Sequence, residues 1–169
     1  MKLWIIYKEG FLISRNIAEM IQDRLEDYID VSVGNANRIE PEFLLEERLE
    51  YLIIGDIISE AIPSLEIQNW VLKYGELSKN HNLNLKALSG FYIALTDIKN
   101  ETLWVEFLQE NIDTEIIYPP ILLLKLKNTY SALQIGALEI VKEFSKDFID
   151  FLINNKKKNN NQKMSSIDK

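Results

Sequence analysis

The chain has 169 residues, a net charge of −7 at pH 7 and no cysteine. This length suits one domain with a full core, and the lack of cysteine excludes disulfides, thiolate nucleophiles and cysteine metal sites. No run approaches ~18 apolar residues, so no integral membrane segment is expected. The first residues also lack the apolar core of a signal peptide. Because a cysteine-free chain suits a reducing compartment, we expect a cytoplasmic location.

Strand-like and helix-like segments alternate along the chain. The expected strands are Leu3–Tyr7, Ile29–Val33, Tyr51–Gly55, Ala87–Leu95 and a fifth that begins at Glu115–Tyr118. The expected helices are about Ser14–Tyr28, Pro41–Arg48, Leu65–Asn80, Glu101–Asn111 and Gly136–Ile153. Pro119 and Pro120 interrupt the fifth strand because neither can donate to a ladder. Residues 121–126 either resume that strand or form a separate piece.

Periodicity and capping chemistry add detail to the helices. Ser14 is suited to be the N-cap of the first helix, whose apolar stripe includes Tyr28. In the fourth helix, Leu103 and Trp104 fall at inward-facing positions, and Trp104 is expected to pack in the core.

The charge is unevenly distributed. Residues 154–169 hold five lysines and one aspartate, net +4, whereas the remainder holds 14 basic and 25 acidic residues, net −11. An acidic body argues against nucleic-acid binding and suits a basic redox or regulatory protein partner, although solubility alone would also explain it. The lysine- and asparagine-rich end has little to pack, so we predict a single domain over residues 1–153 and a disordered tail over residues 154–169.

The alternation predicts an α/β fold. Strands separated by helices pair in parallel through right-handed crossovers. With five strands, the leading arrangement is a three-layer α/β/α fold whose parallel sheet has the strand order 2-1-3-4-5. In such a sheet the ligand site lies at the carboxyl edge, beside the ends of strands 1, 3 and 4.

Three stretches resemble the flavodoxin family. Residues 5–7, the loop after them and residues 14–21 are similar to the family's first strand, phosphate loop and first helix. Residues 31–45 resemble its second strand and short acidic helix, and Tyr51–Asp56 resembles the strand whose following loop lies against the flavin. The resemblance covers about residues 2–153. It looks closer to the flavodoxin domain of menaquinone-dependent protoporphyrinogen oxidases than to long-chain electron carriers.

The resemblance implies FMN binding and electron transfer, with cofactor contacts from three loops. The implied contacts are Lys8, Gly10, Phe11 and Ser14 in the first loop, Asp56, Ile57 and Ile58 after the third strand, and Thr96 and Asp97 after the fourth. The phosphate loop is degenerate, because a family loop is rich in threonine, serine and glycine and this one keeps only Gly10 and Ser14. Leu12 stands at a family glycine, and Glu9 would repel a phosphate. Neither later loop holds an aromatic side chain to stack on the flavin.

Two functions therefore remain open. The protein is an FMN-binding electron carrier or oxidoreductase, or it is a flavodoxin-like domain that has lost FMN and acts as a protein-interaction or regulatory module. A receiver-like role, with Asp56 as phosphoacceptor and Thr96 as switch hydroxyl, is a distant third, because only Glu9 stands where an acidic pair would hold Mg²⁺. No catalytic residue and no metal ligand is predicted, since His81 is the only histidine.

Overall fold

The structure is a computed structural model that describes residues 1–98, 102–125 and 132–165. The five strands are β1 (Lys2–Tyr7), β2 (Asp30–Asn35), β3 (Tyr51–Ile58), β4 (Ala87–Ala94) and β5 (Ile121–Leu124). The five helices of the described residues are α1 (Ile13–Leu25), α2 (Pro41–Glu46), α3 (Leu65–Asn80), α4 (Thr102–Asn111) and α5 (Ala137–Ser165).

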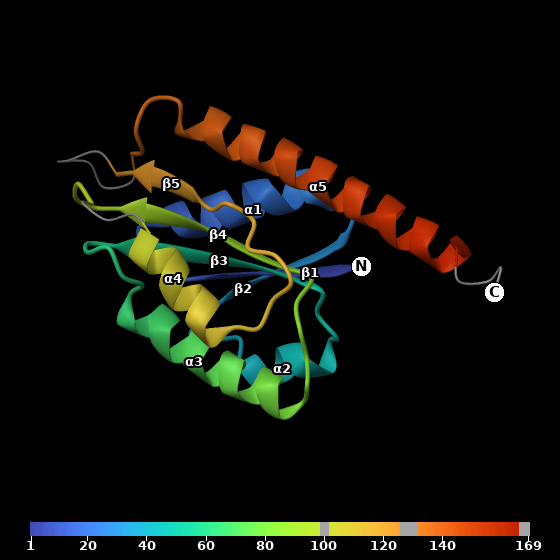
Figure 1. Cartoon of the computed structure of the whole chain (residues 1–169). Helices are drawn as coiled ribbons and strands as arrows, with labels where there is room; N and C mark the ends of the chain where they lie inside the picture. Colours follow the sequence, from blue (N-terminus) through green and yellow to red (C-terminus); the bar gives the residue numbers. More distant parts are fainter. Residues whose placement is uncertain (99–101, 126–131, 166–169) are drawn as a thin grey trace.

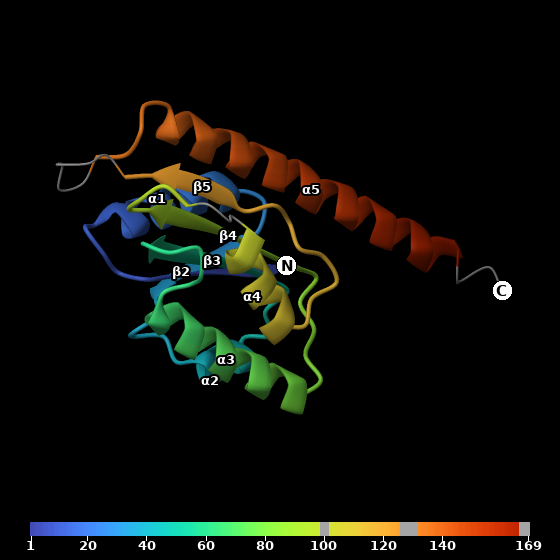
Figure 2. The ribbon, with the colours of Figure 1, turned by 60° about the vertical axis from the view of Figure 1, so that its left-hand side comes forward.

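The strands form one parallel sheet with the order β2-β1-β3-β4-β5, which confirms the predicted α/β class and strand order. Strand β1 pairs on both sides, so that Ile5 lies opposite Val33 in β2 and Ile53 in β3. Helices α1 and α5 cover one face of the sheet, and α2, α3 and α4 cover the other (Figures 1 and 2). All carboxyl ends of the strands therefore meet at one edge.

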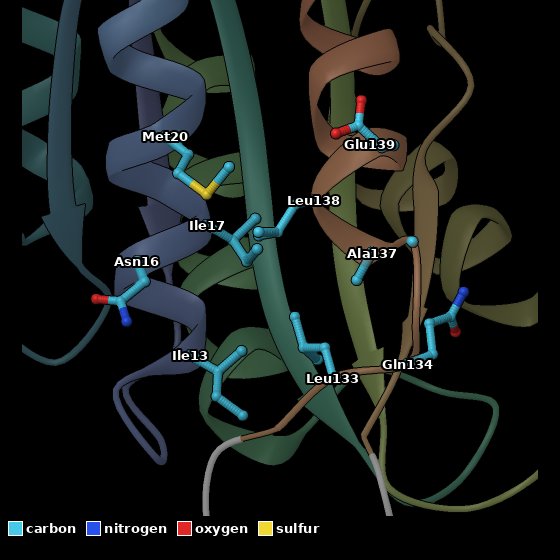
Figure 3. A pocket seen from close by; sticks show the side chains of 10 residues that line it. Ile13, Asn16, Ile17, Met20, Leu133, Gln134, Ala137, Leu138 and Glu139 are labelled. Carbon is cyan, nitrogen blue, oxygen red and sulfur yellow. The ribbon is translucent and has the colours of Figure 1, made fainter.

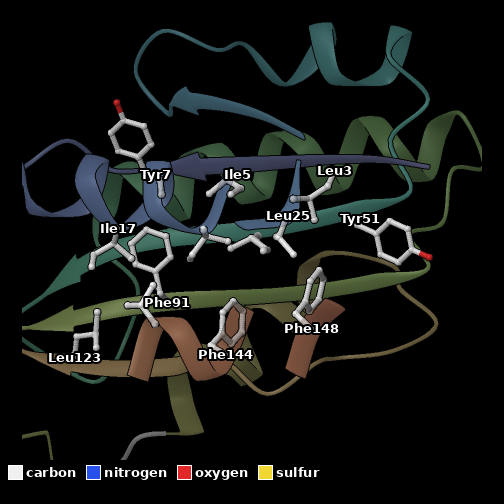
Figure 4. Packing of buried hydrophobic residues seen from close by; sticks show 14 of the residues in the cluster. Leu3, Ile5, Tyr7, Ile17, Leu25, Tyr51, Phe91, Leu123, Phe144 and Phe148 are labelled. Atoms are coloured by element: carbon white, nitrogen blue, oxygen red, sulfur yellow. The ribbon is translucent and has the colours of Figure 1, made fainter. Parts of the chain in front are cut away.

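Each face of the sheet carries its own hydrophobic core. From β1, Leu3, Ile5 and Tyr7 pack under α1 and α5 (Figure 4), whereas Trp4 and Ile6 pack under the helices of the other face. Burial on both faces explains why β1 is apolar throughout instead of alternating.

Two strands differ from the sequence prediction. Strand β3 was expected to end at Gly55, but it continues to Ile58, and Asp56 is a fully buried strand residue. The fifth strand lies after the two prolines, at Ile121–Leu124, and the segment before them makes only isolated bridges to the β4 side of the sheet. Because Pro119 and Pro120 lack N–H groups, regular pairing begins only beyond them.

Tyr28 and Leu103 were expected to face the core, and both predictions are wrong. Helix α1 ends at Leu25, one turn earlier than expected, which leaves Tyr28 in the following turn and 49% exposed. Leu103 is 37% exposed because Trp104, one position further along α4, takes the inward direction and is 1% exposed. The prediction that Trp104 packs in the core is confirmed.

Helix α5 continues beyond Ile153 to Ser165 and runs on past the sheet (Figures 1 and 2). The predicted boundary of the domain at residue 153 stays a prediction. None of the helices in the described part of the chain is long and apolar enough to cross a membrane.

Candidate functional site

The loop between β1 and α1 is held against β3. The Lys8 amide donates to the Gly55 carbonyl at 2.8 Å, and the Ser14 hydroxyl donates to the Lys8 carbonyl at 2.5 Å. Gly10 lies so close to β3 that a Cβ atom on it would stand 2.4 Å from Cδ1 of Ile57. Four predicted site residues, Lys8, Gly10, Ser14 and Ile57, are thus brought together.

Two consecutive residues of this loop adopt the left-handed conformation. Phe11 has φ 52° and Leu12 has φ 57°, a region that costs about 1–2 kcal/mol for a residue with a side chain. Such strain persists only where surrounding contacts hold it, and it concentrates at functional sites. The loop conformation is therefore the feature of this edge that most needs a functional explanation.

The expected N-cap is wrong. The N-cap of α1 is Leu12, which makes no side-chain capping bond. Ser14 lies inside the helix and is fully buried, with its hydroxyl turned back to Lys8. An anion at this helix start would consequently meet backbone N–H groups of the first turn and the positive end of the helix dipole, without help from the serine hydroxyl.

Charged side chains around the loop contact mostly neutral polar or aromatic groups. Glu9 is exposed and accepts a hydrogen bond from the Asn35 amide at 3.1 Å. The Lys8 ammonium lies 3.5 Å from the Ile57 carbonyl, and the exposed Arg15 pairs with Glu19 at 2.8 Å. The exposed ring of Phe11 lies 5.1 Å from the Lys125 ammonium. No single charge dominates the loop.

Asp56 lies beneath the carboxyl edge and accepts four hydrogen bonds. The donors are the amides of Ile57 and Ser64, both at 2.8 Å, the Ser64 hydroxyl at 2.6 Å and the Trp104 indole at 3.2 Å. Burial raises the pKa of the Asp56 carboxyl above its ordinary value, although these donors oppose the rise. A fully buried carboxylate with four donors is not placed to accept a phosphoryl group, so the receiver-like reading gains no support.

The other predicted site residues divide between core and surface. Ile57 and Ile58 are buried in β3, at 6% and 2% exposure. Thr96 and Asp97 are exposed after β4, and the Thr96 hydroxyl donates to the Ser59 carbonyl at 2.8 Å. Thr96 thus contacts the loop after β3, and its hydrogen bond does not involve the loop between Lys8 and Ser14.

The sequence analysis did not select three polar residues at this edge: Asn35, Ser64 and Glu66. The side-chain amide of Asn35 donates a hydrogen bond to Glu9, and the Ser64 hydroxyl donates one to Asp56. Glu66, in the first turn of α3, has a buried Oε1 atom with no hydrogen-bond partner among the described residues, and burial raises its pKa. Asn35 is the last residue of β2 and Ser64 directly precedes α3, and this position at the end of a regular element is the one signal that would have selected them.

A separate cavity of about 520 Å³ lies between α1 and the start of α5 (Figure 3). Its lining is mostly apolar, with side chains of both helices converging on the gap. None of the predicted cofactor contacts lines it. Within the part of the chain that the structure describes, no cluster of histidine and carboxylate side chains is placed to hold a metal ion.

Comparison with known proteins gives matches in structure but not in sequence. No family model matches the chain, and no curated protein is similar enough in sequence to count as a relative. A flavodoxin from the domain Archaea superposes with a TM-score of 0.65 at 18% identity, covering 90% of this chain and 99% of that one. Oxidised flavodoxin 1 from Bacillus cereus gives a TM-score of 0.66 at 13% identity, covering 89% and 98%.

A third similar structure carries a ligand. The general stress protein 14 of Treponema denticola, solved in complex with FMN, gives a TM-score of 0.55 at 12% identity, covering 91% of this chain and 99% of that one. Identities this low establish the fold alone. Together with the parallel sheet of order β2-β1-β3-β4-β5, they show that the chain has the flavodoxin-like fold.

Proposed function

We propose that the protein binds FMN at the carboxyl edge of its sheet and serves in electron transfer. The observation that carries this proposal is the strained β1–α1 loop, in which Phe11 and Leu12 are held left-handed directly before α1. The loop leads directly into the N-terminus of α1, where free N–H groups favour an anion, although it has lost most hydroxyl and glycine residues. A similar structure bound to FMN supports the choice of ligand.

The residues present fit a phosphate through their backbone more than through their side chains. The amides of Ser14 and Arg15 in the first turn of α1 would hold the phosphate, since the Ile13 amide donates to the Gly10 carbonyl at 3.2 Å. Lys8 would supply partial counter-charge. FMN, when bound, supplies the redox chemistry, and the protein contributes orientation and electrostatics. The net charge of −11 outside the tail would disfavour an anionic reduced cofactor and attract a basic partner.

Leu12 offers a matched pair of variants for the test. Its side chain is 60% exposed, and both asparagine and aspartate tolerate the left-handed conformation. Leu12→Asp places a carboxylate beside the phosphate and should weaken FMN binding at least about tenfold, whereas Leu12→Asn, similar in shape but neutral, should not. Fluorescence titration of FMN measures both. Equal affinities of the two variants would show that the phosphate lies elsewhere.

Ser14→Asp, which the sequence alone suggests, is a poorer test because Ser14 is buried. A carboxylate there would disturb the loop itself as well as any phosphate. Loss of FMN binding in that variant would therefore not identify the phosphate position.

A second candidate function is a protein-interaction or regulatory module without FMN. It is favoured by exposed apolar side chains on two loops and a helix start: Phe11 at 38%, Leu12 at 60% and Ile62 at 44% exposure on the loops, and Leu65 at 71% as the first residue of α3. Exposed apolar groups that gather on loops suit a partner surface. A protein that stays colourless and gains no thermal stability with millimolar FMN would favour this module. The basic partner, the cytoplasmic location and the kinship with protoporphyrinogen oxidases stay predictions.

A further inference from the structure

The loop between β3 and α3, residues 59–64, is fixed at both ends by hydrogen bonds from other parts of the fold. At its start, the Thr96 hydroxyl, just beyond β4, donates to the Ser59 carbonyl at 2.8 Å. At its end, the Ser64 amide and hydroxyl donate to the Asp56 carboxylate at 2.8 Å and 2.6 Å. The two ends are therefore attached to two different strands.

The Asp56 side chain is held in place from a second side by Trp104, which is itself tightly packed. The Trp104 indole donates to Asp56 at 3.2 Å and stacks on Tyr92 with ring centroids 4.9 Å apart. A Cβ atom on Gly90 would stand 2.3 Å from the Trp104 ring, so the indole packs directly on β4 at Gly90. The carboxylate thus joins β3, the start of α3 and α4.

The middle of the loop faces outward between these two attachments. Glu60 is exposed and Ile62 is 44% exposed, whereas Pro63 is buried. The attachments at Ser59 and Ser64 set where this apolar side chain stands at the carboxyl edge.

We propose that Asp56 and Thr96 are positioning residues that hold the β3–α3 loop so that its centre meets the ligand of the carboxyl edge. This inference rests on the proposed function, in which that ligand is FMN. In this role the two residues act on the ligand through Ser64 and Ser59, instead of as the direct contacts that the resemblance implies.

Two pairs of variants test the proposal. Thr96→Val removes the hydroxyl at nearly constant shape, and Thr96→Ser keeps it; Ser64→Ala removes the second hydroxyl, and Ser64→Thr keeps it. Amide hydrogen exchange of residues 59–64 reports the loop, and exchange of the β1 amides reports the whole fold. FMN affinity is measured on the same four proteins by fluorescence titration.

Thr96→Val and Ser64→Ala should each speed exchange in residues 59–64 about fivefold, the effect of one lost hydrogen bond, and weaken FMN binding by a similar factor. The β1 amides should be unaffected, and Thr96→Ser and Ser64→Thr should behave as the wild type. If exchange in residues 59–64 is unchanged, or if exchange of the β1 amides is accelerated equally, the two hydroxyls do not hold the loop and the proposal fails. Local acceleration without any loss of FMN affinity would overturn the positioning role.

The failure of the proposed function gives a different pattern. If the wild-type protein binds no FMN, the assignment of the ligand fails, and the exchange data alone decide whether the two hydroxyls hold the loop. If the wild type binds FMN and loop exchange in the variants is unchanged, only the attachment of the loop by Thr96 and Ser64 is refuted.

Discussion

The hydrogen bond from Trp104 to Asp56 should be measurable as a coupling energy. Trp104→Phe removes an N–H donor to a buried carboxylate at 3.2 Å, a distance at the long end of the normal range. Such bonds to charged groups contribute about 1.5–3 kcal/mol, and we take the lower value. The ring atoms lost beside Gly90 and Tyr92 add about 1–2 kcal/mol. The variant should therefore lose about 3 kcal/mol of unfolding free energy, or roughly 6–12 °C in Tm.

A double-mutant cycle with Asp56→Ala separates the bond from the packing, because alanine removes both acceptor oxygens whereas asparagine would keep one. The loss in the double mutant should therefore be smaller than the sum of the two single losses by about 1.5 kcal/mol. Urea unfolding followed by far-ultraviolet circular dichroism is the suitable assay, because the variant changes the tryptophan fluorescence. A coupling below ~0.3 kcal/mol would show that the indole only fills space, and that Asp56 does not join α4 to β3.

Two further predictions concern stability. Gly75→Ala should cost about 3 kcal/mol in urea unfolding, because its Cβ would stand 1.9 Å from the Asn111 carbonyl oxygen. Gly136→Ala, the matched control in open space, should cost only about 1 kcal/mol for its left-handed φ of 84°; equal losses would contradict this packing of α3 on α4. Burial raises the pKa of Tyr74, so the unfolded chain ionises first and stability should fall as pH rises above about 10. Tyr74→Phe should flatten that fall, and an unchanged slope between pH 9 and 11 would place the titration elsewhere.

The sheet could be predicted from the sequence because its three central strands, β1, β3 and β4, are buried on both faces. A continuous apolar run such as Leu3–Tyr7 fits a central parallel strand and little else. The same reasoning failed where a polar residue sits inside such a run. The apolar run predicts a strand that ends at Gly55, before Asp56, whereas four hydrogen-bond donors to the Asp56 carboxylate allow β3 to continue to Ile58.

The candidate site was predictable in position and not in detail. Parallel topology places Lys8, Gly10 and Thr96 at the carboxyl edge whatever their side chains do. The partner of each polar group depends on contacts between residues far apart in the chain, as with Thr96 and Ser59. Local rules gave Ser14 the N-cap position, whereas the folded loop turns its hydroxyl toward Lys8. Side-chain hydrogen bonds of this kind have no periodic signature in the sequence.

FMN binding by the purified wild-type protein is the measurement that tests the central proposal most directly. The visible absorption spectrum and the Tm would be recorded with and without added FMN. A flavin spectrum that stays with the protein through gel filtration, together with a Tm that rises with FMN concentration, is the predicted result. A colourless protein whose Tm does not change at millimolar FMN would contradict the proposal and leave the interaction module as the better account of this edge.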